Sequence, residues 1–508
     1  MFSMIKSIGI FGIDTYMIQI EADISGGLPS FNIVGLPDAA VRESGDRVRA
    51  AIKNSGFKFP AGRITVNLAP ADKKKEGAIY DLPIMLSVLL ASEQIKMTSS
   101  DCAFLGELSL DGKVRPINGV LAMAITAKEA GIKDLFVPAD NAAEGAAVEG
   151  INVYGVSHAK EVLNHLSETA RILPAKPQYD AVEPDFDMLD FADVKGQIAA
   201  KKALEVAAAG GHNILLIGPP GAGKSMLAKR LPTILPEMTF SESIQTTKIH
   251  SVAGIIDKHH PIVSARPFRS PHHTISAAGL TGGGSIPKPG EISLAHNGVL
   301  FLDELPEFRR DAMEALRAPL EDGVVTVSRV SGSVTYPSSI TLVAAMNPCP
   351  CGFYGHPSKQ CTCTLNMVHK YLNRISGPML DRLDLHVEVP PVDYKSLNAA
   401  GKSESSAEIR ERVNRARAIQ NKRYAGTGVT CNARLTPVLI RKFCVTADDA
   451  ADYLSRSFEE LGLSARAYDR ILKVARTIAD LEASEVITRQ HVFAAIRFRS
   501  LDRKYWTE

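Results

Sequence analysis

The sequence lacks several features that would place it in a specialised class of protein. No apolar run in its 508 residues reaches the about 20 residues that a membrane-spanning helix requires. The N-terminus has no signal-peptide pattern, and no internal repeats are visible. The formal net charge is only +2, so overall charge points to no particular partner. We therefore expect a cytoplasmic, folded protein of about three domains with no membrane partner.

Cysteine is scarce, and its placement is uneven. There are seven cysteines, of which four form two C-x-C pairs separated by nine residues: Cys349, Cys351, Cys361 and Cys363. In a chain without a signal peptide, such a cluster favours metal binding or free thiols over disulfides. Four thiolates can enclose a tetrahedral Zn²⁺, so we predict a structural zinc. Reduced, unliganded thiols are the alternative, and His356 or His369 can substitute for one thiolate.

A nucleotide-binding signature is present. The run Gly218–Ser225 follows an apolar stretch and precedes a helical pattern, which indicates a strand, a phosphate loop and a helix. Glycines let backbone N–H groups close around phosphates, and the helix directs its positive end at them. Lys224 is expected to reach the β- and γ-phosphates, and Ser225 to hold Mg²⁺. The predicted nucleotide-binding residues of this run are Gly218, Pro219, Pro220, Gly221, Ala222, Gly223, Lys224, Ser225 and Met226.

Two further strand ends supply polar residues for the same site. Four apolar residues precede Asp303 and Glu304, which predicts a buried parallel strand with both carboxylates at its carboxyl end. Asp303 would orient Mg²⁺, and Glu304 would polarise the attacking water. The strand predicted at 340–346 ends on Asn347, which can hold that water against the γ-phosphate. A plain turn before Pro348 is the alternative for Asn347.

The chain divides into an N-terminal part, a linker and a nucleotide domain. Residues 1–168 alternate strand-like and helical segments, the clearest of which lie at 17–22, 64–68 and 81–90. Residues 169–188 are rich in proline and acidic residues without periodicity, which is typical of a linker.

The nucleotide domain is expected at 189–393, with a helix at 198–210 and a cysteine-rich insertion at 347–364. Residues 394–508 read as helical, most clearly at 408–423 and 463–481. Residues 401–508 carry 20 lysines and arginines against 14 acidic residues, which is compatible with nucleic-acid binding.

Together these motifs resemble the magnesium-chelatase-like branch of the AAA+ ATPases, and within it the ComM and YifB group. The resemblance covers essentially the whole chain and also rests on 267–274 (PFRSPHHT), 376–384 (SGPMLDRLD) and 463–467 (LSARA). It implies an α/β fold in three parts: a Lon-protease-like (ribosomal-S5-like) N-terminal domain, a P-loop domain with a parallel sheet, and a helical lid. It also implies a homo-hexameric, ATP- and Mg²⁺-dependent DNA helicase that drives branch migration during natural transformation, with a recombinase as a possible partner.

The resemblance assigns roles to two arginines. Arg382 resembles an arginine finger that would reach the γ-phosphate of a neighbouring subunit, and Arg466 resembles the second sensor of the lid. A structural salt bridge is the alternative for each. If Arg382 acts on a neighbour, assembly is part of the mechanism.

Two insertions mark this branch. The first spans 255–294, includes the glycine-rich run 281–285, and supplies Arg266 and Arg269 as predicted DNA contacts, since long loops within compact domains are usually functional. His272 and His273 lie in it, but they have no third ligand at a suitable spacing and so do not predict a metal site.

The second insertion spans 323–336. Alternating β-formers around 331–333 predict a β-hairpin. The resemblance implies that this hairpin projects into a central pore, where Arg329 would meet a phosphate backbone. An exposed hairpin charge without a DNA role is the alternative.

The N-terminal part resembles a Lon-protease-like domain through residues 104–119. A Ser–Lys dyad would place its nucleophile near 76–80 and its base near 120–121, but these segments contain no serine and no lysine. We therefore predict a non-proteolytic domain that serves assembly or DNA contact. The lysine run 73–75 is either a phosphate-binding patch or a solvated charge run. A chelatase-type motor and, less favoured, an ATP-dependent protease are the alternative functions.

Overall fold

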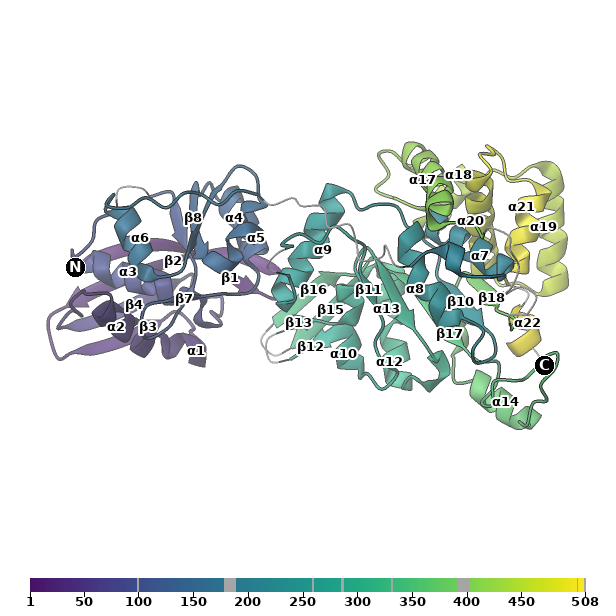
Figure 1. Cartoon of the computed structure of the whole chain (residues 1–508), viewed down its shortest axis with the longest axis horizontal. Coiled ribbons are helices and arrows are strands. Elements are labelled where there is room, and N and C mark those ends of the chain that lie inside the picture. Colours follow the sequence, from purple (N-terminus) through teal and green to yellow (C-terminus); the bar gives the residue numbers. More distant parts are fainter. Residues whose placement is uncertain are drawn as a thin grey trace.

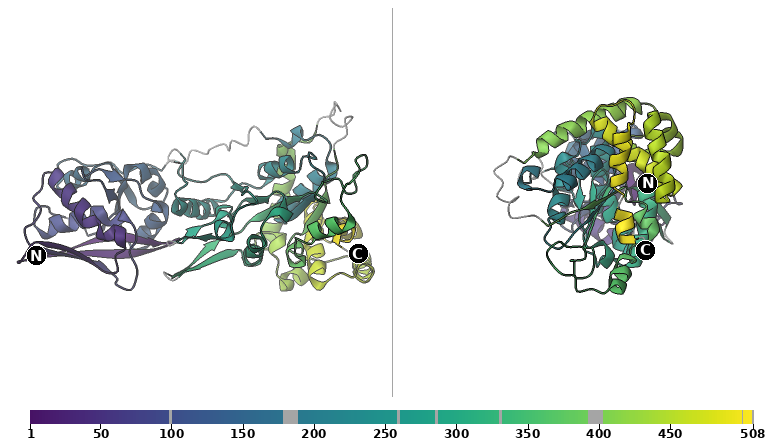
Figure 2. Two further views of the ribbon diagram at one scale, coloured as in Figure 1. Left: turned by 90° about the horizontal axis from the view of Figure 1, so that it is seen from below. Right: turned by 90° about the vertical axis from the view of Figure 1, so that its right-hand side faces the viewer.

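The computed structural model describes residues 1–97, 100–177, 189–257, 260–284, 287–329, 332–391, 403–499 and 501–506. The molecule is elongated, with the N-terminal α/β domain at one end, the nucleotide domain in the middle and the helical lid at the other end (Figures 1 and 2). Most of the predicted linker 169–188 and the predicted start of the lid at 394 lie outside the described residues. No helix among those described combines the length and apolar character needed to cross a bilayer.

A seven-stranded mixed sheet organises the N-terminal domain. Its strands follow the order β3-β4-β2-β1-β5-β8-β9. The strands predicted at 17–22 and 64–68 and the helix predicted at 81–90 are confirmed as parts of β2, β4 and α3. The strands are β1 (Phe2–Phe11), β2 (Asp14–Ser25), β3 (Ser30–Val34), β4 (Arg63–Ala69), β5 (Cys102–Phe104), β8 (Asp134–Pro138) and β9 (Asn152–Val156), beside the short pair β6 (Glu107–Leu108) and β7 (Val114–Arg115). The helices are α1 (Ala39–Arg42), α2 (Ser44–Asn54), α3 (Asp81–Ala91), α4 (Val120–Glu129), α5 (Ala142–Ala146) and α6 (Ala159–Leu166).

A five-stranded parallel sheet forms the core of the nucleotide domain, and its order is β11-β14-β17-β10-β18. The central strands are entirely apolar and buried, because helices cover both faces of a parallel sheet. The strands are β10 (Ile214–Ile217), β11 (Phe268–Arg269), β14 (Val299–Leu302), β17 (Thr341–Met346) and β18 (Leu385–Glu388). The helices are α7 (Ile198–Gly210), α8 (Lys224–Ile234), α9 (Phe240–Ala253), α10 (Ala277–Thr281), α11 (Glu291–Leu294), α12 (Arg310–Ala315), α13 (Arg317–Asp322), α14 (Leu365–Leu372) and α15 (Gly377–Leu380).

The lid consists of helices, and the two predicted at 408–423 and 463–481 are confirmed. Serine side chains set where they begin: Ser405 accepts from the backbone N–H of Glu408, and Ser464 from that of Ala467. The lid helices are α17 (Ser406–Arg423), α18 (Pro437–Phe443), α19 (Asp448–Leu461), α20 (Ala465–Leu481) and α21 (Arg489–Arg497).

The last described helix, α22 (Leu501–Trp506), returns to the nucleotide domain, where it contacts β18 and α14 (Figure 1). The indole N–H of Trp506 donates to the carbonyl of Leu372 in α14 at 3.3 Å, and Lys504 pairs with Glu388 of β18 at 2.7 Å. The C-terminal end of the chain therefore belongs physically to the core.

The segment 255–294, which we predicted to be an insertion with a glycine-rich run, contains several regular elements. It contains β11, the edge strand of the core sheet, and a small antiparallel pair of β12 (Gly282–Gly283) and β13 (Lys288–Pro289). β11 pairs through only two residues, which is too short to produce a periodic pattern in the sequence. Part of the glycine-rich run, at 285, lies outside the described residues.

The predicted hairpin is confirmed as β15 (Val324–Arg329) and β16 (Gly332–Pro337), which pair antiparallel. Residues 330–331 lie outside the described part. The buried face of the hairpin packs against the turn between β1 and β2: a Cβ on Gly12 would come within 2.4 Å of a methyl carbon of Val334. Gly12 has a φ of +60°, so this turn requires glycine for both conformation and space.

A buried polar contact also joins the N-terminal domain to the nucleotide domain. The carboxylate of Glu144, on α5, accepts hydrogen bonds from the Leu121 backbone N–H at 2.8 Å and from the Ser251 hydroxyl on α9. Burial raises the pKa of Glu144, and these donors oppose the shift. Apolar contacts and a buried, hydrogen-bonded carboxylate thus join the two domains.

Candidate nucleotide and metal sites

The parallel sheet brings the predicted nucleotide-binding residues to one edge. The phosphate loop follows β10, Asp303 and Glu304 follow β14, and Asn347 follows β17. These residues, with loop residues Pro220–Met226, line one pocket of about 330 Å³. Residues that are up to 127 positions apart in the chain therefore converge because carboxyl ends of parallel strands share an edge.

Lys224 connects two of these strand ends. Its side chain is 8% exposed, and its ammonium donates to the carbonyls of Gly218 at 2.7 Å and Pro219 at 3.0 Å. A third bond, 3.0 Å long, reaches the side-chain carbonyl of Asn347. Burial lowers the pKa of Lys224, while the charges of Asp303 and Glu304 raise it. The ammonium thus lies where phosphate oxygens would replace carbonyl oxygens as its acceptors.

The groups predicted to hold Mg²⁺ are adjacent. The Ser225 hydroxyl donates to Asp303 across 2.6 Å, and Asp303 also accepts from the backbone N–H of Glu304 at 3.0 Å. Hydroxyl and carboxylate oxygens are ligands that Mg²⁺ accepts readily. The donor set therefore fits the ion.

Glu304 has an unusual backbone conformation. Its φ of 55° and ψ of 46° place it in the left-handed region, which costs a non-glycine residue of order 1–3 kcal/mol. The side chain is 56% exposed, and Oε2 lies 3.4 Å from Nδ1 of His273. The backbone therefore presents this carboxylate to solvent, with an imidazole at its side.

The contact of His273 with Glu304 is one that the sequence analysis missed. His273 follows β11, which lies beside β14 in the sheet, so both side chains emerge at the same edge. Its ring lies against that of His272, with centroids 4.1 Å apart and planes tilted by 34°, and it meets Phe308 edge-on. Only the pairing of β11 with β14 places His273 here, and no periodic signal reveals that pairing.

Gln197 is a second residue that the sequence analysis did not single out. Its side-chain amide donates to the carbonyl of Ala222 in the phosphate loop at 3.2 Å and to that of Pro390 at 2.7 Å. It occupies the left-handed N-cap position of α7, with a φ of 55°. Gln197 therefore ties the phosphate loop to the segment that follows β18.

Comparison with known proteins agrees with this geometry. Models of magnesium chelatase subunit ChlI match residues 190–397, 20–141 and, for its C-terminal part, 403–499. The chain is 46% identical to the uncharacterized protein YifB of Salmonella typhimurium over 97% of its own length and 96% of that protein. It is 44% identical to competence protein ComM of Haemophilus influenzae, covering 99% and 98% of the two chains.

The chain belongs to the ComM and YifB group of magnesium-chelatase-like AAA+ proteins. The magnesium-chelatase 67 kDa subunit of Chlorobaculum parvum is more distant, at 29% identity over 32% of this chain and 24% of that protein. The predicted family and three-part fold class are therefore confirmed, whereas the roles of single residues stay predictions.

Arg382 and Arg466, to which the family resemblance assigns catalytic roles, do not line the nucleotide pocket. Arg382 is 8% exposed; it pairs with Glu321 at 2.5 Å and donates to the carbonyls of Pro378 and Arg317. Arg466 lies exposed in the first turn of α20. A single chain thus keeps Arg382 folded inward.

The three arginines predicted to contact DNA differ in their surroundings. Arg266 donates to the carbonyls of Pro236, Asn297 and Glu237, and Arg269 forms a bidentate pair with Glu291. Both guanidinium groups thus have partners within the nucleotide domain, and their contacts with DNA stay predictions. Arg329 is exposed at the end of β15, where its guanidinium donates to the carbonyl of the neighbouring Ser328 at 3.1 Å.

The four clustered cysteines have the geometry of a metal site. Their sulfur atoms all lie within 4.8 Å of one another, and three of the separations are 3.4, 3.5 and 3.7 Å. Four sulfurs about 2.3 Å from a tetrahedral Zn²⁺ would be about 3.8 Å apart, whereas a disulfide requires about 2.05 Å. All four are free thiols, so the donor set fits Zn²⁺ and not two disulfides.

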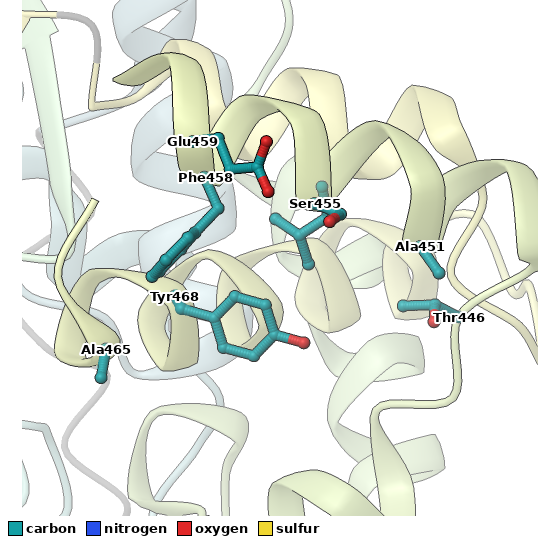
Figure 3. A pocket seen from close by; sticks show the side chains of 8 residues that line it. Thr446, Ala451, Ser455, Phe458, Glu459, Ala465 and Tyr468 are labelled. Carbon is teal, nitrogen blue, oxygen red and sulfur yellow. The ribbon is translucent and has the colours of Figure 1, made fainter. Parts of the chain in front are cut away.

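A separate groove of about 400 Å³ lies in the lid between α19 and α20 (Figure 3). Phe458 and Tyr468 line it and meet edge to face, with ring centroids 6.0 Å apart and planes at 85°. Glu459 is the charged residue of its lining, and the described residues that line it include no lysine, arginine or histidine. The groove therefore offers no positive charge to phosphate, and it is separate from the nucleotide pocket.

Substitution of Lys224 and Glu304 should separate nucleotide binding from hydrolysis. Lys224→Ala should abolish ATP binding, whereas Glu304→Gln should bind ATP but hydrolyse it about 10²–10⁴-fold more slowly, because it loses only water activation. Nucleotide titration and steady-state hydrolysis measure the two effects. Glu307→Gln is the matched control, since Glu307 is a half-exposed neighbour paired with Arg374 outside the pocket. Near-normal turnover by Glu304→Gln would contradict its assigned role.

His273→Ala should lower kcat about tenfold while leaving the KM for ATP within about twofold, because the ring contacts Glu304 but does not line the phosphate pocket. His272→Ala is the control, because His272 bonds to Thr274 in its own loop. If the two substitutions lowered kcat equally, the loss would come from disturbance of the loop and not from removal of the contact between His273 and Glu304.

Proposed function

We propose that the chain is an ATP-driven DNA helicase that assembles as a homo-hexamer and promotes branch migration in homologous recombination during natural transformation. The observation that carries the proposal is the convergence of Lys224, Asp303, Glu304 and Asn347 in one pocket at the sheet edge. A relative of nearly equal length is called a competence protein, which supports the biological context.

Hydrolysis follows from the groups around the pocket. Lys224 would exchange its carbonyl partners for the β- and γ-phosphates, and Ser225 and Asp303 would hold Mg²⁺, which supplies charge neutralisation. Glu304, exposed beside the pocket, would orient and deprotonate water. Asn347 would align the same water from the next strand. Each of the three strand ends thus contributes one part of the reaction.

Assembly would complete the site. Arg382 is bound to Glu321, whose own side chain is half exposed. At a subunit interface, its guanidinium would leave Glu321 for the γ-phosphate of the neighbouring subunit and stabilise the charge of the transition state. Arg466 is exposed at the start of α20 and would contact the nucleotide of its own subunit from the lid.

DNA would be gripped through its backbone. Arg329 is the exposed cation at the end of the β15–β16 hairpin, and a guanidinium there suits phosphate contact without base readout. The hairpin also packs on the β1–β2 turn, so the N-terminal domain would support it instead of cleaving substrates. This domain lacks the serine and lysine of a protease dyad in the segments expected to hold them. Arg266 and Arg269 are omitted from the proposed grip because their partners are internal.

The cysteine cluster would hold one structural Zn²⁺. Its sulfur separations fit tetrahedral coordination, and four protein ligands leave no open position for chemistry. A chelatase-type motor is the second candidate function, because three family models derive from a chelatase subunit. The rate of ATP hydrolysis with and without DNA distinguishes the two functions, since DNA is not expected to accelerate hydrolysis by a chelatase-type motor.

A subunit-mixing experiment tests the ring. Lys224→Ala damages a subunit's own nucleotide site, and Arg382→Ala damages what it offers to its neighbour, so mixed rings should contain some intact composite sites and recover ATPase activity. Lys224→Ala mixed with Glu304→Gln is the matched control, because both changes damage the same side of the interface. No recovery in the first mixture, despite demonstrated co-assembly, would show that Arg382 acts within its own subunit.

Arg329→Ala should reduce DNA stimulation of ATPase and unwinding of forked DNA, while basal ATPase and assembly stay intact. DNA binding should be insensitive to base sequence. The slope of log binding constant against log salt concentration should fall by about one in the variant, as expected for the loss of one phosphate contact. Arg329→Lys should retain part of the activity, and Arg415→Ala, which removes an exposed cation from α17, is the control. Normal unwinding by Arg329→Ala would place the DNA grip elsewhere.

A further inference from the structure

The cysteine-rich segment touches the phosphate loop directly. A Cβ built on Gly352 would lie 2.5 Å from Cδ and 3.1 Å from Cγ of Pro220. Contacts this short mean that the Pro220 ring packs against the bare backbone of Gly352. Pro220 lines the nucleotide pocket, so one side of that pocket rests on the cysteine-rich segment.

The same segment is continuous with the strand end that carries Asn347. Cys349 follows Asn347 by two residues, is fully buried, and packs with Met346 in the core. Asn347 in turn accepts the hydrogen bond of Lys224. The first sulfur of the cluster is therefore close in the chain to a residue of the pocket, and Gly352 is one residue beyond the second sulfur.

The backbone around Gly352 is organised by the first cysteine. The N–H of Gly352 donates to the carbonyl of Cys349 at 3.0 Å, and the N–H of Tyr354 donates to its sulfur at 3.3 Å. Beyond this turn the segment has little apolar support, since residues 357–360 are all exposed. Coordination of the four sulfurs would therefore add a constraint that keeps this turn in place.

We propose that metal bound by the four cysteines positions Pro220 and Asn347, and thereby sets the affinity of the neighbouring pocket for ATP. The inference rests on the proposed zinc and nucleotide sites and adds a coupling between them. The metal takes no part in the chemistry. It holds the Gly352 turn against the phosphate loop, and loss of metal lets the loop move away from the geometry that cradles phosphate.

Two glycines of the segment provide a matched pair of variants. Gly352 and Gly355 both have left-handed backbones, with φ of +83° and +74°, so alanine at either position carries similar conformational strain. A Cβ on Gly355 has no atom within 4 Å, whereas one on Gly352 collides with Pro220. Comparison of the two variants therefore isolates the contact with the phosphate loop.

The experiment measures zinc per chain, the Kd of a fluorescent ATP analogue and thermal unfolding for the full-length wild type, Gly352→Ala and Gly355→Ala. Both variants should keep about one Zn²⁺ per chain, as the sulfurs are untouched. Gly352→Ala should weaken nucleotide binding on the order of 10-fold or more, because small displacements of a phosphate-binding group are costly. Gly355→Ala should bind within about twofold of wild type.

Removal of the metal supplies the second arm. Cys361→Ser with Cys363→Ser, or chelation of the wild type, should lower zinc content and weaken nucleotide binding together, and added Zn²⁺ should restore both after chelation. Metal-depleted, folded protein that binds nucleotide as tightly as loaded protein would overturn the coupling, as would Gly352→Ala behaving like its control. Protein that takes up no zinc would instead refute the zinc site itself, and loaded protein that binds but never hydrolyses ATP would refute only the proposed motor function.

Discussion

The parallel alignment of β10, β14 and β17 is the constraint on which the rest of this structure depends. Their ladders place Ile217 beside Met346 and Leu302 beside Ala344, so three apolar strands finish at one edge. Backbone groups within the strands are satisfied by the ladder, and the residues just beyond it are free to serve a ligand. A shift of one strand would move a catalytic group by about 3.3 Å per residue, which is enough to dismantle the site.

Around this edge, the site is supported from several distant segments of the chain. Gln197 holds the phosphate loop toward β18, His273 reaches Glu304 from the edge strand, and Gly352 supports Pro220 from the cysteine-rich segment. Each of these contacts joins the phosphate loop or the Glu304 carboxylate to a segment elsewhere in the chain.

Contacts between distant segments also join the N-terminal domain to the hairpin and to α9. Val334 packs at the turn that contains Gly12, while the Glu144 carboxylate receives the Ser251 hydroxyl from α9. An apolar contact supplies burial, and a satisfied carboxylate supplies specificity, since leaving it without donors would cost about 1–3 kcal/mol or more. The hairpin is consequently a shared element of two domains, and Arg329 stands where both meet.

The sequence by itself determined the class of chemistry, the family, and the elements with strong periodic or apolar patterns, including α7, α20 and the three central strands. Those features are local, because each can be recognised within about 20 residues of sequence. They are a phosphate loop, four apolar residues before two carboxylates, and a capped amphipathic helix. Tertiary structure alone decided which side chains meet. β11 pairs through only two residues and leaves no periodic pattern, so the contact of His273 with Glu304 could not be predicted from the sequence. Nor did the sequence indicate that Arg266 donates to a backbone carbonyl of its own domain. The helix α22 likewise joins the core and not the lid, because Trp506 finds its partner 134 residues earlier in the chain.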